Sequence, residues 1–238
     1  MPASFFGLRQ QPMGGGPAAH RLPIDTLPMV SAVRARFVSE RGFTLIEMLM
    51  VLAIIGVLAA ISVPMSGNAV RYMKISGDAR DLSNAAAVAK MRAAAKFTQS
   101  RLYMDTTGKT YVVQTFDKTV TVPCPTGCWV NEGGTTTLSS TVSYGYGPVS
   151  AAPSNTQTTI GQAPQCMNTA STPVAIANTA CMTFNSRGLP VDATGSPFGD
   201  DAIYVTDGSA VYGITVAATG FIRLWRNNYV STPSWTLQ

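Results

Sequence analysis

The main apolar run of the chain covers residues 43–63 and contains one charged residue, Glu47. At about 1.5 Å of rise per residue, a helix of this length is about 31 Å long and matches a hydrocarbon core of roughly 30 Å. A secretory signal has a shorter apolar region of about 7–15 residues before its cleavage site. Leu58-Ala59-Ala60 resembles such a site only weakly. The run therefore predicts a membrane-spanning helix.

A second apolar pattern follows at helical period and is rich in alanine. We expect the helix to continue to about residue 97, with this stripe packed closely against a sheet. Lys74 and Asp78 are four residues apart and are expected to pair on the helix surface. The stripe consists of Ile75, Ala79, Leu82, Ala86, Ala89, Ala93 and Phe97.

Beyond residue 102 the pattern changes to short segments rich in β-branched and aromatic residues, which predict strands. Asp207-Gly208 and Thr219-Gly220 separate the last three segments, so these are expected to form consecutive antiparallel hairpins. In a regular last strand, Arg223 and Arg226 lie on opposite faces. The predicted strands are 111–116, 120–122, 174–176, 181–185, 203–206, 211–216 and 221–226.

These patterns together predict an α+β fold, in which a long N-terminal helix packs on an antiparallel β-sheet domain. Residues 1–42 have little periodicity and form an N-terminal segment of their own. The membrane-spanning part is expected at 43–64, its amphipathic continuation at 65–97 and the β-rich domain at 98–238.

The basic residues next to the apolar run predict its orientation. Arg34, Arg36 and Arg41 precede the run, whereas the first basic residue after it is Arg71. By the positive-inside rule, the N-terminus is cytoplasmic and the large C-terminal part lies on the other side of the membrane.

Charge and histidine content narrow the possible functions. The net charge is +5, but residues 1–42 carry five arginines against two acids, so the remainder is only weakly basic. The basic character is thus poor evidence for nucleic-acid binding.

His20, the one histidine, lies in residues 1–42, so a chain without this segment has no Ser–His or Cys–His pair and no histidine metal ligand. We therefore expect neither an enzyme nor a cofactor. The acids that could form a carboxylate pair are instead predicted to be turn residues: Asp192, Asp200, Asp201 and Asp207.

The four cysteines, Cys124, Cys128, Cys166 and Cys181, all follow the apolar run. In an oxidising compartment an even number predicts disulfides. Three pairings are possible, and we favour the local ones, Cys124–Cys128 and Cys166–Cys181. The competing interpretation is a zinc site, which would need an unusual Cys-x3-Cys spacing.

Residues 133–186 contain no charged side chain. We expect a long external loop held by cysteine in this region. The alternative is a surface displayed for binding or glycosylation, although residues 147–173 contain no Asn-x-Ser/Thr acceptor.

Glu47 requires an explanation, because a carboxylate at the centre of a membrane helix costs on the order of 2.5–3.5 kcal/mol. One explanation places it one turn into the helix, near the headgroups, where the helix dipole favours an anion. The other is a partner of opposite charge, since two charges in an apolar bundle are each unfavourable alone and tolerable together.

The hexapeptide Gly42-Phe-Thr-Leu-Ile-Glu47 resembles the class III signal of type IV pilins and type II secretion pseudopilins. The resemblance implies a pilin-like fold, a leader at 1–42 that prepilin peptidase removes after Gly42, and N-methylation of Phe43. It also implies that Glu47 pairs with the N-terminal amine of a neighbouring subunit. Gly56 and Pro64 fall where the family has residues that loosen the helix in the filament, and both residue types weaken helices in general. A start at Met29 would give a 14-residue leader, a length more typical of the family.

The end of the chain resembles the FimT/GspH group of minor pilins and pseudopilins, with Phe184, Gly188, Gly220 and Arg223 at the matching places. Some FimT-like proteins bind DNA through a Gly-Arg-x-Arg segment near the C-terminus. Here the first arginine is replaced by Phe221. Arg223 and Arg226 remain, but they lie on opposite faces of the predicted strand and therefore make a weak binding site for phosphate.

The expected function is that of a structural minor subunit of a type IV pilus or a type II secretion pseudopilus. The resemblance implies other pilin-like subunits, prepilin peptidase and an inner-membrane assembly platform as partners. The expected location is the inner membrane, single-pass, with the C-terminal domain in the periplasm and later in the filament. The alternatives are a DNA-binding minor pilin and an ordinary membrane-anchored periplasmic protein.

Overall fold

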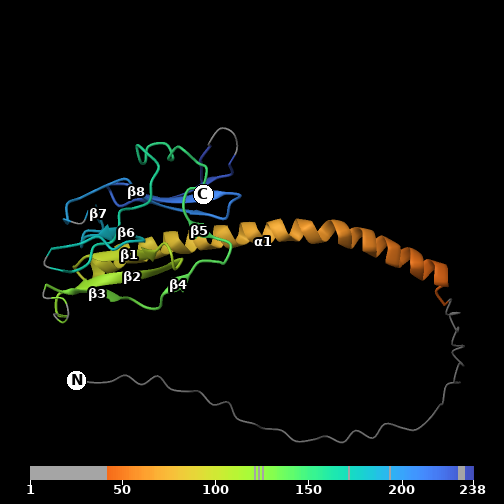
Figure 1. Ribbon diagram of the computed structural model, residues 1–238, viewed down its shortest axis with the longest axis horizontal. Helices are drawn as coiled ribbons and strands as arrows, with labels where there is room; N and C mark the ends of the chain where they lie inside the picture. Colours follow the sequence, from red (N-terminus) through yellow and green to blue (C-terminus); the bar gives the residue numbers. More distant parts are fainter. Residues whose placement is uncertain are drawn as a thin grey trace, which may run out of the picture. The chain divides into compact units, whose positions relative to one another are not determined.

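The computed structural model describes residues 42–120, 122, 124, 126–170, 172–192, 194–229 and 234–238, without the side chains of residues 63–65. The chain divides into two units, Met1–Leu49 and Met50–Gln238. The expected leader at 1–42 lies outside the described residues except for Gly42. A single long helix, α1 (Leu45–Ala95), contains both the apolar run and the alanine-rich stripe (Figure 1).

The stripe is the buried face of α1, as its spacing predicts. Six of its seven residues have no exposed surface, from Ile75 to Ala93. Four of the six are alanines, whose small side chains allow the helix backbone to approach its neighbours closely. Asp78 does not pair with Lys74 as expected. It accepts hydrogen bonds from the backbone N–H of Ser139 (2.8 Å) and from its hydroxyl (3.1 Å), which fix the 139–142 turn on the helix.

Phe97 is the exception in the stripe, and its predicted burial is wrong. The helix ends at Ala95, and Phe97 has a φ of 52° with 87% of its surface exposed. The N–H of Thr98 donates to the carbonyl of Ala93 (3.2 Å), and that of Phe97 to the carbonyl of Ala94 (3.4 Å). This pair of bonds is a Schellman motif, which turns the chain at a left-handed residue and takes Phe97 off the helical period.

Two antiparallel sheets make up the rest of the fold. The first has the order β3-β2-β1-β6-β7, with β4 paired to β2, and the second the order β11-β10-β9-β8-β5. The first sheet consists of β1 (Ser100–Asp105), β2 (Thr110–Asp117), β3 (Cys128–Asn131), β4 (Thr136–Thr137), β6 (Thr179–Phe184) and β7 (Pro190–Val191). The second consists of β5 (Ser143–Tyr144), β8 (Asp201–Thr206), β9 (Val211–Val216), β10 (Ile222–Asn227) and β11 (Thr236–Leu237).

One hydrophobic core joins α1 to both sheets. It contains the helix stripe together with Leu102 and Met104 of β1, Met182 of β6 and Ile203 and Ile214 of the second sheet, all buried. In the view of Figure 1, β8 lies on one side of the second half of α1, and β1 and β2 lie on the other. The architecture is therefore α+β, with a long N-terminal helix on antiparallel sheets, which confirms the predicted fold class.

Most predicted strands exist, but their number is larger than expected. The last three predicted strands correspond to β8, β9 and β10, which form consecutive antiparallel hairpins, as predicted. The expected strand at 120–122 is wrong: Val120 and Val122 are irregular, and residue 121 lies outside the described residues. In the expected strand at 174–176, only Ala175 forms a bridge, with Met167. β1 and β3 were not predicted, because their buried and polar residues do not alternate clearly.

The charge-free segment contains β4, β5 and β6, so it is not one long loop; its irregular stretch between β5 and β6, residues 145–170 and 172–178, lies against both sheets and is called the cover. Tyr204 on β8 donates its N–H to the side-chain oxygen of Gln162 and accepts a bond from its amide nitrogen, both at 2.8 Å. The amide thus pairs with the edge of β8 as a strand would. Val149, Ala163 and Cys166 of the same segment are buried.

The acids predicted in turns divide into two groups. Asp192 and Asp207 accept bonds from the N–H groups two residues on, as Asx turns do. Asp201 was wrongly assigned to a turn: it begins β8 and is only 3% exposed. Asp200, with a φ of 75°, forms the bend before it.

Candidate assembly segment

The first turn of α1 contains the residues that the sequence singles out for processing and assembly. Thr44 precedes the helix, and its hydroxyl accepts a bond from the N–H of Glu47 (3.2 Å), while its carbonyl accepts one from the N–H of Met48 (3.2 Å). Thr44 is therefore the N-cap, and Glu47 occupies the third helical position. This Thr-x-x-Glu spacing is that of a capping box.

The helix cap also determines where along the helix the charge of Glu47 lies. In the first turn the carboxylate lies at the positive end of the helix dipole, which favours an anion by about 0.3–1 kcal/mol. Glu47 is exposed, and its side chain makes no hydrogen bond or ion pair with another described residue. The carboxylate is therefore free to bind a cation from outside the described part of the chain.

The surface around Glu47 is apolar on every side of the helix. All large apolar side chains between Phe43 and Ile61 are exposed. A helix that is apolar all round is stable only in a membrane or among other apolar surfaces. By length and composition, the N-terminal part of α1 can cross a membrane.

Gly56 and Pro64 both lie within α1, which is continuous through them. A Cβ atom added at Gly56 would meet nothing within 4 Å. Packing within the described chain therefore gives no reason for glycine at this position. The loosening role of the two residues stays a prediction.

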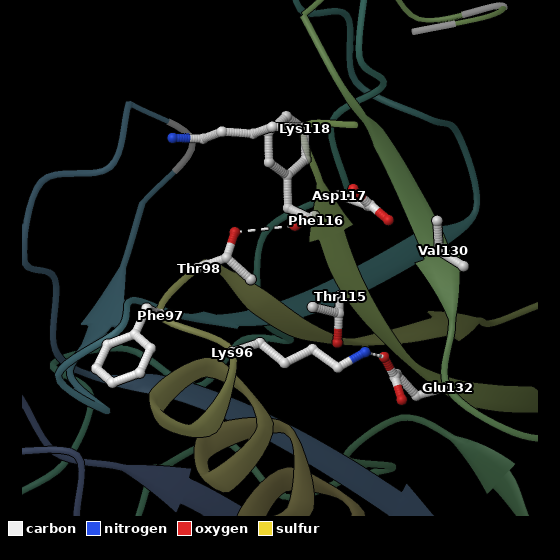
Figure 2. Close-up of a pocket in the computed structure, with 9 residues that line it drawn as sticks. All are labelled: Lys96, Phe97, Thr98, Thr115, Phe116, Asp117, Lys118, Val130 and Glu132. Atoms are coloured by element: carbon white, nitrogen blue, oxygen red, sulfur yellow. Dashed lines mark hydrogen bonds and ion pairs between the residues drawn. The ribbon is translucent and has the colours of Figure 1, made fainter. Parts of the chain in front are cut away.

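The far end of α1 borders a hollow on the first sheet (Figure 2). Figure 2 shows the side chain of Lys96 reaching to Glu132, with which it forms an ion pair, while the ring of Phe97 points away from the hollow. The hydroxyl of Thr98 donates to the carbonyl of Phe116 (2.9 Å). The ion pair with Lys96 is the main reason that the pKa of Glu132 is lowered. These contacts fasten the helix end to β2 and β3.

The glycines of the C-terminal pattern meet in space. A Cβ atom on Gly220 would lie 2.3 Å from the carbonyl oxygen of Gly188, and one on Gly188 would lie 3.0 Å from Cε of Lys90. The ammonium of Lys90, on α1, donates to the carbonyl of Gly220 (2.9 Å). The pattern therefore includes a contact that joins two turns and the helix, and sequence reasoning missed Lys90.

The two arginines of β10, Arg223 and Arg226, point apart. Arg226 lies over the ring of Tyr72 on α1, 4.6 Å from its centroid, whereas Arg223 lies over Phe221, 5.4 Å away. Arg223 lines a hollow with Arg80 of the helix, which sequence reasoning did not associate with it. A DNA contact at Arg223 and Arg226 stays a prediction.

All four cysteines form disulfides, Cys124–Cys128 and Cys166–Cys181, the two pairs that the sequence favours. A zinc site would need free thiolates, so this pairing leaves no cysteine ligand for it. The described residues contain no other group of acids, histidines or cysteines that could hold a metal.

Comparison with known proteins bears on the start of α1. A family model described as the prokaryotic N-terminal methylation motif matches residues 38–63, a range that includes Gly42, Phe43, Glu47 and Gly56. No curated protein and no solved structure matches the chain. The motif supports pilin-like processing, and together with the apolar helix it supports single-pass membrane anchoring. The FimT/GspH assignment stays a prediction.

Proposed function

We propose that the protein is a structural, non-enzymatic minor subunit of a type IV pilus or a type II secretion pseudopilus. In this proposal prepilin peptidase cleaves after Gly42 and Phe43 becomes N-methylated. The inner membrane holds the subunit until an assembly platform adds it to other pilin-like subunits. The observation that carries the proposal is one helix with two environments: a fully exposed apolar part that bears the methylation motif, and a second part with one buried face.

In the proposed mechanism, Glu47 guides assembly. Cleavage creates an amine at Phe43, one residue before the helix cap at Thr44. In a bundle of apolar helices, the carboxylate of one subunit and the amine of its neighbour would neutralise each other. Removing one partner of such a buried pair costs on the order of 3–5 kcal/mol, because the other charge is left alone.

The test is assembly of Glu47→Ala in cells that contain the machinery. We expect normal membrane insertion, while the fraction in sheared filaments or pseudopili falls by more than about tenfold. Asp81→Ala, which removes an exposed carboxylate further along α1, is the matched control and should assemble normally. Normal assembly of Glu47→Ala would refute the pairing.

Processing is tested separately by mass spectrometry of the membrane fraction. We expect a mature chain that begins at Phe43 and carries one methyl group, and a full-length chain in cells without prepilin peptidase. An intact leader in cells with the peptidase, or cleavage near Ala60, would overturn the proposal.

A further inference from the structure

A cavity of about 450 Å³ lies on the face of the first sheet opposite the core, beneath the charge-free cover. Its floor includes Arg101 of β1 and Trp129 of β3, and its roof includes Pro164 and Met167 of the cover. This volume is within the range of about 300–1,000 Å³ that is usual for small-molecule sites. Most of the exposed surface of the cavity is apolar, and polar side chains, including Arg101 and Asp192, are interspersed in its lining.

Arg101 is the unusual group in this lining, because it is only 4% exposed and has no acidic partner. Its Nε donates to the side-chain oxygen of Gln114 and its Nη1 to the carbonyl of Met167, both at 2.8 Å. The guanidinium lies over the ring of Trp129, 4.1 Å from its centroid, and this stacking fixes its plane. A guanidinium has five N–H donors, so three have no partner among the described residues.

The charge of Arg101 is also uncompensated. Burial lowers its pKa to about 10, and the residue is therefore still cationic at neutral pH. Asp192 is the one acid among the described lining residues, and it forms no ion pair with Arg101. One carboxylate oxygen of Asp192 already accepts bonds from Thr194 and Ser196. A buried cation without a counter-charge is costly, and an anion that enters the cavity would remove that cost.

We propose that this cavity binds an organic carboxylate with an apolar body. The planar fork of the guanidinium matches the two oxygens of a carboxylate, which would take its free donors. The apolar body would lie against Trp129 and Met167. The carboxylate belongs either to a free acid or to the C-terminus of a peptide. The site is distant in sequence from Glu47, and the proposal does not depend on pilus assembly.

The experiment is calorimetric titration of the full chain in nanodiscs, with empty nanodiscs as the blank. The probes are 3-phenylpropionate and the peptide acetyl-Gly-Phe with a free C-terminus, each against its uncharged counterpart, 3-phenylpropanol or the peptide amide. We expect a charged probe to bind about 10- to 100-fold more tightly than its uncharged counterpart. A preference for the acid or for the peptide identifies the source.

Variants separate this site from other surfaces. Arg101→Gln should weaken carboxylate binding by the same factor, and Arg80→Gln, on the helix surface, should leave it unchanged. Ala170→Trp fills the cavity from its exposed rim, leaves Arg101 in place and should abolish binding. This second variant keeps the test valid if Arg101→Gln does not fold. Equal affinity for charged and uncharged probes, or undiminished binding by Ala170→Trp, would overturn the proposal.

Discussion

Gly220 allows segments that are distant in the sequence to pack closely, because it has no side chain. It has a φ of 77°, and its Cα lies so close to the carbonyl of Gly188 that no side chain fits. The carbonyl of Gly220 in turn accepts the bond from Lys90. Two turns and the helix therefore meet at one point, and any larger residue must displace all three.

We predict that Gly220→Ala is much more destabilising than Gly208→Ala. Both glycines have a left-handed backbone, with φ of 77° and 84°, so each alanine carries a strain of about 1 kcal/mol. A Cβ at Gly208 meets nothing within 4 Å, whereas one at Gly220 overlaps backbone and should cost about 1–3 kcal/mol more. Urea unfolding of the two variants measures the difference. Equal losses would show that the close contact relaxes freely.

Asp201 gives the stability of the domain an unusual pH dependence. Burial, with a smaller contribution from Asp200, raises its pKa to about 7, against about 3.9 in an unfolded chain. The folded protein therefore binds the proton more tightly than the unfolded chain. The stabilisation is fully present below about pH 4 and is lost as the pH rises through 7.

We predict that the unfolding free energy of the wild type falls by on the order of 2–3 kcal/mol between pH 5 and pH 8 because of this group. Asp201→Asn should remove the slope and be the more stable protein at pH 8. Asp192→Asn is the control, because hydrogen bonds lower the pKa of Asp192 and its titration lies below this window. Parallel slopes for wild type and Asp201→Asn would contradict the assignment.

At the scale of elements, the C-terminal turn of α1 forms although the residue in its left-handed position is unfavourable there. Glycine is the usual residue at the left-handed position of a Schellman motif, and Phe97 occupies it here. Because its ring is exposed, it gains little from packing. The ion pair of Lys96 and the bond of Thr98 keep the turn in place.

We predict that Phe97→Gly stabilises the domain by about 0.5–1 kcal/mol, because it removes left-handed strain. Met91→Gly, at an exposed position inside the helix, should instead cost about 1 kcal/mol. Thermal unfolding of both variants shows the sign of each change. A loss of stability in Phe97→Gly would mean that the ring makes a contact that stabilises the domain.

The elements differ in how far their sequence reveals them. The helix stripe repeats at helical period over five turns and was predicted residue by residue up to Ala93. β1 was missed because Tyr103 on its outer face and Ser100 on its inner face interrupt the alternation of polar and apolar residues that marks a strand. The cavity could not be foreseen either, because it depends on Arg101 meeting the carbonyl of Met167, 66 residues away. The contact of Lys90 with Gly220 spans 130 residues, and its only local signal was the pair of glycines.

At the scale of the whole molecule, composition separates three kinds of surface. The first part of α1 is apolar on all sides, its second part is apolar on one side, and the cover is polar without charge. Each composition predicts an environment in outline: a membrane, the core or the exterior. It did not reveal that the uncharged cover would close the edge of β8 and form the roof of a cavity, because these roles come from single side chains such as Gln162.

The disulfide between Cys166 and Cys181 makes the stability of the cover depend on oxidation. It joins the cover to β6, and both cysteines line the cavity. Closing a loop of this size stabilises the fold by about 3 kcal/mol. A newly made chain in a reducing compartment lacks this covalent tie and holds its roof less firmly. Oxidation of this pair therefore fixes the roof of the cavity, so the carboxylate binding that we propose should be stronger in the oxidised protein than in the reduced one.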